Sequence, residues 1–144
     1  MPAADSLGFV APDPPQLSAV LETSLYHSSA ETEAMTHFYS QVLGLRQVAG
    51  WGDGRAFRLG PGVVLLFDRE RIADRGEPIA AHGTEGPGHA CLVAGDCDEW
   101  RERLGRAGVE VTHEQQWPSG RRSIYFLDPA GNLLEIADGD LWPE

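Results

Sequence analysis

The amino-acid sequence predicts an α+β fold in which two β-α-β-β-β modules pair into a curved, partly open, barrel-like sheet around a cavity. The main observation is a weak internal repeat, because a strand, a capped helix and further apolar strands follow one another twice in the 144 residues. The second observation is composition: 42% hydrophobic and 23% charged residues are ordinary for a globular chain. We therefore expect a single domain over residues 18–138, with a flexible tail over 1–17 and a short tail over 139–144.

The first module covers residues 18–68. Its helix is expected to begin at a capping box formed by Ser28 and Glu31 and to end at Gly44, which can take the left-handed conformation of a C-cap. Apolar side chains recur along this segment at helical spacing, at Ala34, Met35, Phe38, Val42 and Leu45. The strands expected in this module cover residues 20–27, 55–59 and 63–67. A connector rich in glycine and proline follows over residues 69–87 and reads as a loop.

The second module covers residues 88–138 and repeats this order. Asp96 and Glu99 resemble a second capping box, and Gly108 is placed to end the helix that follows. Trp100, Leu104 and Ala107 form the apolar side of that helix. The strands expected in this module cover residues 89–93, 109–112, 123–127 and 133–137. Each half-sheet would bury one face against its helix, which leaves the other face to line the cavity.

The charge balance disfavours two classes of partner. Eleven Lys and Arg residues against 22 Asp and Glu residues give a formal net charge of −11. Nucleic acid requires a clustered positive surface, and an anionic membrane leaflet repels a chain of this charge, so we expect neither partner. The same excess of negative charge would attract a metal cation or a cationic small molecule.

The sequence also predicts a cytoplasmic protein. No stretch approaches the roughly 18 apolar residues of a membrane span, and the N-terminus lacks the basic and apolar regions of a secretory signal. Cys91 and Cys97 form neither a disulfide framework nor a zinc-ribbon pattern. A reducing compartment is the expected location of such a chain.

Three side chains of the metal-ligand type occupy strand positions that point away from the helix. Because side chains alternate along a strand, Glu22, His89 and Glu135 are each expected on the cavity face. Two carboxylates and one imidazole suit a divalent cation, and three protein ligands leave positions open for water or substrate. The alternative is that both carboxylates lie at exposed strand edges and that His89 is a hydrogen-bonded core residue.

A second set of residues is expected to contact a substrate. Tyr125 is a candidate catalytic residue because its hydroxyl can donate a proton, and Glu135 is a second candidate if its carboxylate detaches from an ion. Arg122 would bind a substrate carboxylate, against the alternative of a solvated surface residue. His82, in the connector, is either a solvated loop residue or part of a lid. The other candidates for substrate contact are Ser24, Tyr26, Cys91, Trp117 and Ser123.

Two motifs resemble the vicinal oxygen chelate superfamily. Phe38-Tyr39 with Val42-Leu43-Gly44-Leu45 is similar to its first module, and the run from Asp128 to Glu135, with the pattern DPxGNxxE, is similar to its second. The resemblance covers residues 18–138. It implies paired βαβββ modules that commonly assemble as homodimers. The group includes glyoxalase I, extradiol dioxygenases, fosfomycin-resistance thiol transferases and bleomycin-binding proteins.

The resemblance also implies where a metal would be held. The ligand positions of the superfamily fall on Glu22, Leu66, His89 and Glu135. Leu66 cannot bind a metal. Glu22 stands where the three-ligand enzymes usually have histidine, which disfavours the two-histidine, one-carboxylate iron site of an extradiol dioxygenase. The expected cofactor is one divalent ion, with Mn, Mg, Zn, Ni and Fe left open.

Two functions remain open at this point. The first is a metal-dependent enzyme that chelates a small oxygen-rich substrate through vicinal oxygens, in a lyase, isomerase, transferase or oxygenase reaction. The second is a metal-free protein that confers resistance by sequestering a cationic antibiotic such as bleomycin, which the net charge of −11 favours. A weaker third option is a dimeric domain whose cavity only senses a metabolite. In each case the expected assembly is a homodimer that binds small molecules, and the sequence leaves open whether its cavity is shared between subunits.

Overall fold

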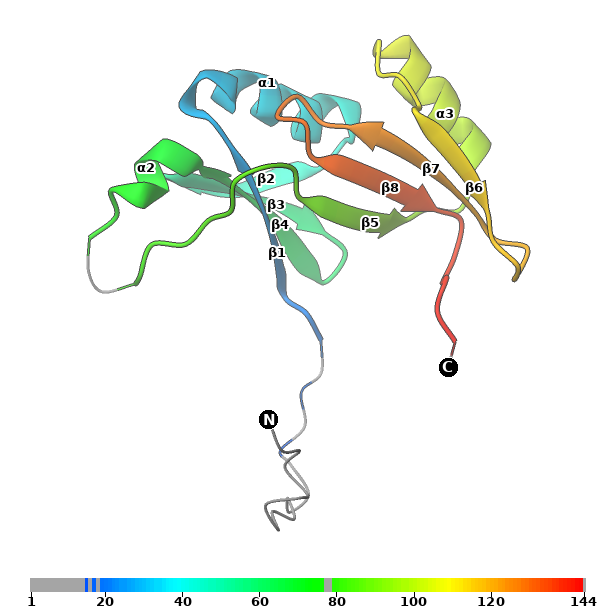
Figure 1. Cartoon of the computed structure of the whole chain (residues 1–144), viewed down its shortest axis with the longest axis horizontal. Helices are drawn as coiled ribbons and strands as arrows, with labels where there is room; N and C mark the ends of the chain where they lie inside the picture. Colours follow the sequence, from blue (N-terminus) through cyan, green and yellow to red (C-terminus); the bar gives the residue numbers. More distant parts are fainter. Residues whose placement is uncertain (1–14, 16, 18, 77–78, 144) are drawn as a thin grey trace.

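The computed structural model describes residues 15, 17, 19–76 and 79–143, and two four-stranded sheets lie next to each other in it (Figure 1). Helices α1 (Thr32–His37) and α3 (Cys97–Arg106) lie on the same side of the pair of sheets. The predicted α+β fold is confirmed. Within the described residues the two sheets remain separate, so they form an open, curved surface rather than a closed barrel.

The first sheet has the strand order β1-β4-β3-β2. Its strands are β1 (Glu22–His27), β2 (Arg46–Trp51), β3 (Gly54–Leu59) and β4 (Gly62–Asp68). β1 runs parallel to β4, whereas β4, β3 and β2 form an antiparallel meander. β2 lies outside the predicted strands, because all six of its residues are exposed and no apolar alternation marks it.

The second sheet repeats this topology with the order β5-β8-β7-β6. Its strands are β5 (His89–Val93), β6 (His113–Gln116), β7 (Arg122–Leu127) and β8 (Leu133–Ala137). The strand predicted over residues 109–112 is wrong. Pairing with β7 begins at His113, whereas Val109 and Val111 are partly buried and pack against the hydrophobic core.

The segment after β1 winds continuously but changes its hydrogen bonding twice. A 3₁₀ turn, η2 (Ser29–Glu31), precedes α1, and a π-helix, η3 (Phe38–Val42), follows it. The predicted capping box is confirmed, since the backbone N–H and the hydroxyl of Ser28 both donate to Glu31 Oε1, at 2.8 and 2.6 Å. The segment ends at Gly44, whose φ of +73° is the left-handed conformation expected of a C-cap residue.

A further helix, α2 (Arg69–Ala73), corrects the prediction that residues 69–87 form only a loop. Asp68 begins this helix by accepting hydrogen bonds from the backbone N–H groups of Glu70 and Arg71. Ile72 is buried beneath it, in a small cluster on the first sheet. α2 therefore anchors the start of the connector to the end of β4.

One hydrophobic core joins the two modules. It is built from both main helices and from the helix-facing side of both sheets, and its largest fully buried members include Met35, Tyr39, Phe57, Leu104, Ile124 and Phe126. Buried polar contacts add to it: Tyr39 donates a hydrogen bond to Asp128 Oδ2 at 2.9 Å, and Asn132 accepts one from the Gly88 N–H at 2.8 Å. Because the helix sides of both sheets are used in this shared core, the opposite faces stay open.

The two ends of the chain are described only in part. The tail predicted over residues 1–17 lies almost wholly outside the described residues. Gly139 to Pro143 follow β8 without forming a helix or strand. In the part of the chain that the structure describes, no helix is long and apolar enough to cross a membrane.

Candidate functional site

Four side chains with chemical function lie in one row across the second sheet. The register pairs Cys91 of β5 with Glu135 of β8, Glu135 with Tyr125 of β7, and Tyr125 with His113 of β6. Residues paired across neighbouring strands point to the same face. The alternate residues of β7 and β8 are buried in the shared core, so the row lies on the open face. His113 joins it although the sequence indicated no role for it.

His89 lies beside this row, and its imidazole approaches the Glu135 carboxylate. The ring atom Nδ1 lies 2.9 Å from the backbone oxygen of Leu133. A carbonyl oxygen only accepts, so Nδ1 donates this hydrogen bond and Nε2 is the ring atom turned toward the open face. Nε2 lies 3.4 Å from Glu135 Oε1. Histidines that bind metals are oriented in this way, by a hydrogen bond from the second ring nitrogen.

The carboxylate of Glu135 is buried and incompletely satisfied. The residue is 5% exposed, and Oε2 has no hydrogen-bond partner among the described residues. An ionised carboxylate in such a place is unfavourable unless a cation or a proton compensates its charge. Since Nε2 of His89 also faces it, the pair places one nitrogen and one carboxylate side by side, a donor set that fits a divalent cation.

Two neighbours of Glu135 keep their protons near neutral pH. Burial raises the pKa of the Cys91 thiol to about 11, and the negative charge of Glu135 adds to the effect. Burial also raises the pKa of Tyr125; Ser123 opposes this shift and Glu135 reinforces it. Tyr125 can therefore donate a hydrogen bond or a proton to an oxygen atom bound on this face. Cys91, in contrast, is not a thiolate nucleophile.

Glu22 does not lie with His89 and Glu135 in this chain. It is the first residue of β1, its register partner is Val63 of β4, and it lies at one end of a pocket on the first sheet. Within the described ranges, no group of three or more His, Cys, Asp or Glu side chains is arranged to hold a metal ion. Of the three predicted ligands, only His89 and Glu135 therefore lie together within the described chain, and the assignment of Glu22 as a ligand stays a prediction.

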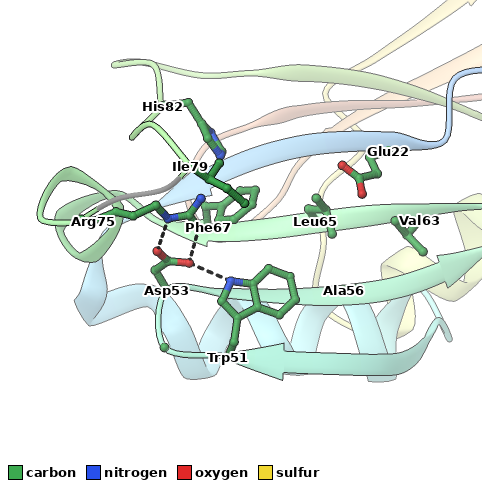
Figure 2. A pocket seen from close by; sticks show the side chains of 12 residues that line it. Glu22, Trp51, Asp53, Ala56, Val63, Leu65, Phe67, Arg75, Ile79 and His82 are labelled. Carbon is green, nitrogen blue, oxygen red and sulfur yellow. Dashed lines mark hydrogen bonds and ion pairs between the residues drawn. The ribbon is translucent and has the colours of Figure 1, made fainter.

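The pocket on the first sheet has a volume of about 710 Å³ and an apolar floor (Figure 2). Glu22 lies at one end of it. At the other end Arg75 and Asp53 form a salt bridge, with 2.7 Å between Arg75 Nη2 and Asp53 Oδ1. The first sheet and the connector supply all of its walls. This pocket is therefore not the predicted cavity between the modules, because none of its described lining residues belongs to the second module.

The register also corrects the position assigned to a fourth ligand. Glu22 and His89 begin β1 and β5, so Ser24, which pairs with Leu65, corresponds to Cys91, which pairs with Glu135. Leu65 is therefore the counterpart of Glu135, and it lines the pocket. Leu66 instead lies in the shared core. Residues 65 and 66 are both leucine, so the first sheet has no metal ligand at the position that corresponds to Glu135.

The predicted substrate contacts of the first sheet lie on its open face. Tyr26 and His82 form a hydrogen bond of 2.5 Å between the tyrosine hydroxyl and Nδ1. His82 is thus an exposed loop residue whose ring contacts Tyr26 and Phe67. Ser24 is exposed on the same face, next to Leu65. These residues border the apolar pocket and lie on the other sheet from the His89–Glu135 pair.

The predicted contacts of the second sheet divide between its two faces. Trp117 Nε1 donates to Ser123 Oγ at 3.0 Å, which holds the indole against the strand that carries Tyr125. The guanidinium of Arg122 pairs with the carboxylates of Asp98 and Glu114. Because both carboxylates belong to the chain itself, the substrate-binding role predicted for Arg122 does not fit its position.

The sequence reasoning missed the charged pair of the pocket. Asp53 and Arg75 lie 22 positions apart, and no periodicity connects them. The signal closest to them is the run Trp51-Gly52-Asp53-Gly54, a tight turn with an aromatic residue at its start. His113 would have been found if the strand predicted over 109–112 had begun at residue 113, since alternation then places it with Tyr125 on the open face.

Comparisons with known proteins agree on one family. A family model described as the Glyoxalase/Bleomycin resistance protein/Dioxygenase superfamily matches residues 28–136. A glutathione transferase FosA from Serratia marcescens is 31% identical over 106 residues, which cover 72% of this chain and 70% of the relative. A crystal structure of a lactoylglutathione lyase from Agrobacterium tumefaciens superposes with a TM-score of 0.81 at 39% identity, covering 90% and 98% of the two chains. A virulence protein from Salmonella typhimurium superposes with a TM-score of 0.68 at 25% identity, covering 85% and 98%.

Proposed function

The chain belongs to the Glyoxalase/Bleomycin resistance protein/Dioxygenase superfamily, and from this premise we propose that it is a divalent-metal-dependent enzyme. The observation that carries the proposal is the His89–Glu135 pair, in which Nε2 of the imidazole faces a buried carboxylate that has an oxygen without a partner among the described residues. These two side chains would hold the ion, and a small substrate would bind through two neighbouring oxygen atoms. The chemistry that the ion supplies when bound is polarisation of those oxygens as a Lewis acid.

The residues around the pair have separate roles in this proposal. Tyr125 is protonated and next to Glu135, so it is placed to donate a proton to a substrate oxygen. Trp117 and Ser123 form a rigid wall beside it. The names of the relatives, a lyase and a transferase, favour one of these two reactions over an oxygenase reaction.

We further propose that the third ligand, Glu22, comes from a second copy of the chain. Glu22 lies on the open face of the first sheet, whereas His89 and Glu135 lie on the open face of the second. An isologous homodimer that lays the first sheet of one copy over the second sheet of the other would form two equal sites. Val93 and Leu127, which are 70% and 47% exposed, lie on the open face of the second sheet and would be covered in such a dimer.

The compartment stays a prediction of the sequence. Cys91 and Cys97 are both free thiols. Free thiols persist in a reducing environment. The cytoplasm is therefore the compartment that we propose for the enzyme.

The competing proposal is a metal-free protein that sequesters a cationic antibiotic. It is favoured by the net charge of −11 and by Glu22 at one end of an apolar pocket. Such a protein would not need the His89–Glu135 pair. The two proposals therefore differ in whether metal content depends on this pair.

Metal analysis of purified variants tests the proposal. Wild-type protein, incubated with Mn²⁺, Ni²⁺ or Zn²⁺ and desalted, should retain about one ion per chain by mass spectrometry. Glu135→Gln and His89→Ala should each lower this content by about tenfold or more, since even the loss of a group behind a ligand weakens binding by about 10–100-fold. Glu110→Gln changes an exposed carboxylate on another segment and should leave the content unchanged.

Two results would contradict the enzyme proposal. The first is wild-type protein that retains no divalent ion. The second is a Glu135→Gln variant with wild-type metal content. In either case, tight binding of bleomycin to the metal-free protein would favour sequestration instead.

A further inference from the structure

Six apolar and aromatic side chains supply most of the exposed surface of the pocket on the first sheet. These are Trp51, Ala56, Val63, Leu65, Phe67 and Ile79 (Figure 2). Its volume of about 710 Å³ lies within the range of pockets that bury drug-sized ligands. A substrate made only of polar groups would leave this surface without a partner. The pocket therefore has room for a second, apolar part of a molecule.

Trp51 and Phe67 form an aromatic platform on the floor of this pocket, at the end away from Glu22. Trp51 lies across Gly54, where an added Cβ atom would come within 2.7 Å of the indole and 3.0 Å of the Phe67 ring. The indole N–H donates to Asp53 Oδ1 at 2.8 Å, which fixes its orientation. Trp51 is nevertheless 44% exposed, so a face of the ring remains open to a ligand. Tryptophan held in this way provides contact area with little loss of conformational entropy on binding.

The connector covers the same end of the pocket. His82 packs edge-on against Phe67, with 4.7 Å between ring centroids, and bonds to the Tyr26 hydroxyl. Ile79 precedes it, lines the pocket, and is 64% exposed. The segment that carries Trp51 and the part of the connector that carries Ile79 and His82 thus line the same end of the pocket, although they are distant in sequence.

The charges around the platform do not favour an anionic ligand. Among the described residues that line the pocket, Arg75 is the only arginine, and its guanidinium donates two hydrogen bonds to Asp53, at 2.9 and 2.7 Å. This bidentate pair leaves little positive charge for a ligand carboxylate. Glu22 adds a negative charge at the other end. The lining therefore matches an uncharged body better than an anionic peptide such as glutathione.

We propose that the substrate carries an uncharged aromatic body that lies on Trp51 and Phe67, with its two chelating oxygens at the Glu22 end of the pocket. This inference rests on the proposed function, because Glu22 is the proposed third ligand. It adds the class of substrate: an aromatic compound with vicinal oxygens. In this proposal, Trp51 and Phe67 bind the aromatic body of the substrate, and the metal site binds its two oxygen atoms.

A matched pair of hydroxamic acids tests the proposal by calorimetry on zinc-loaded protein. Benzohydroxamic acid and acetohydroxamic acid present the same two oxygens and differ only in the aromatic body. Benzohydroxamic acid should bind about tenfold more tightly, and Trp51→Ala should remove this preference while leaving acetohydroxamic acid unaffected. Trp51→Phe should retain the preference. Trp142→Ala, which removes an exposed tryptophan outside the pocket lining, should have no effect.

A probe without a chelating pair separates this proposal from the metal site. 2-Naphthylmethanol should bind to the metal-free protein, and Trp51→Ala should weaken it by about tenfold. If this probe binds and neither hydroxamic acid responds to zinc, the pocket is supported and the metal site is overturned. If both hydroxamic acids bind equally and only with zinc, the metal site stands and the aromatic body is overturned. Binding of S-methylglutathione that depends on Trp51 would also overturn the assignment.

Discussion

If the metal site is shared between two copies of the chain, co-expressed variants should differ in metal content in a characteristic way. Glu22→Gln removes the charged ligand of the first sheet, and Glu135→Gln removes that of the second. In a homodimer of either variant, each of the two sites lacks one carboxylate. Metal content should then fall by about tenfold or more in both homodimers.

The heterodimer of the two variants should behave differently, because each site of the proposed dimer would join the first sheet of one copy to the second sheet of the other. One of its sites carries both substitutions, one from each copy, and its other site keeps both carboxylates. The heterodimer should therefore hold about half the metal of the wild-type dimer. Two affinity tags, one on each variant, allow its purification, and mass spectrometry of the metal gives the content. Wild-type protein with both tags and the two homodimers are the references.

Three outcomes would refute this reasoning. A heterodimer without metal would put Glu22 and Glu135 of the same chain into one site. A Glu22→Gln homodimer with full metal content would remove Glu22 from the ligand set. Wild-type protein that holds its full complement of metal as a monomer would remove the need for a second copy.

Two further predictions concern stability. Tyr39→Phe removes the buried hydrogen bond to Asp128, and the free energy of unfolding in urea should fall by about 1–2 kcal/mol; an unchanged value would mean that this contact between the modules has no net effect. Hydrogen bonds from Arg75 hold the pKa of Asp53 below its ordinary value, so their stabilisation is present above the unfolded pKa of about 3.9 and is lost as the pH falls through the lower folded value. The difference in unfolding free energy between wild type and Asp53→Asn should therefore shrink between about pH 7 and about pH 2.5; a constant difference would contradict it.

Much of the fold follows from signals that act over a few residues. The capping box at Ser28 and the left-handed glycines Gly44 and Gly108 take the predicted conformations, because their geometry depends on immediate neighbours. β2 could not be predicted in this way, since an exposed strand needs no apolar alternation. α2 was not predicted because five residues are too few to show helical spacing of apolar side chains, although Asp68 is a recognisable N-cap.

The candidate site is predictable only in part. Alternation along β5 and β8 places His89 and Glu135 on one face, and the register then brings them together. Alternation does not determine which sheet faces meet. Glu22 is on the predicted face of β1, but the shared core takes up the helix sides of both modules, so its face does not meet that of Glu135 in one chain. Which sheet faces lie opposite each other depends on how whole modules pack, and alternation along single strands does not determine it.

A hydrocarbon side chain stands in the first sheet where the second sheet has a carboxylate. The two halves of the repeat have thereby lost their equivalence at this position, with Leu65 in the pocket wall and Glu135 beside His89. An ion bound between facing sheets would receive at most three side chains from these positions, which leaves about half of an octahedral coordination shell free. The asymmetry of the duplicated halves, more than their similarity, would thus make room for an exchangeable molecule at such an ion.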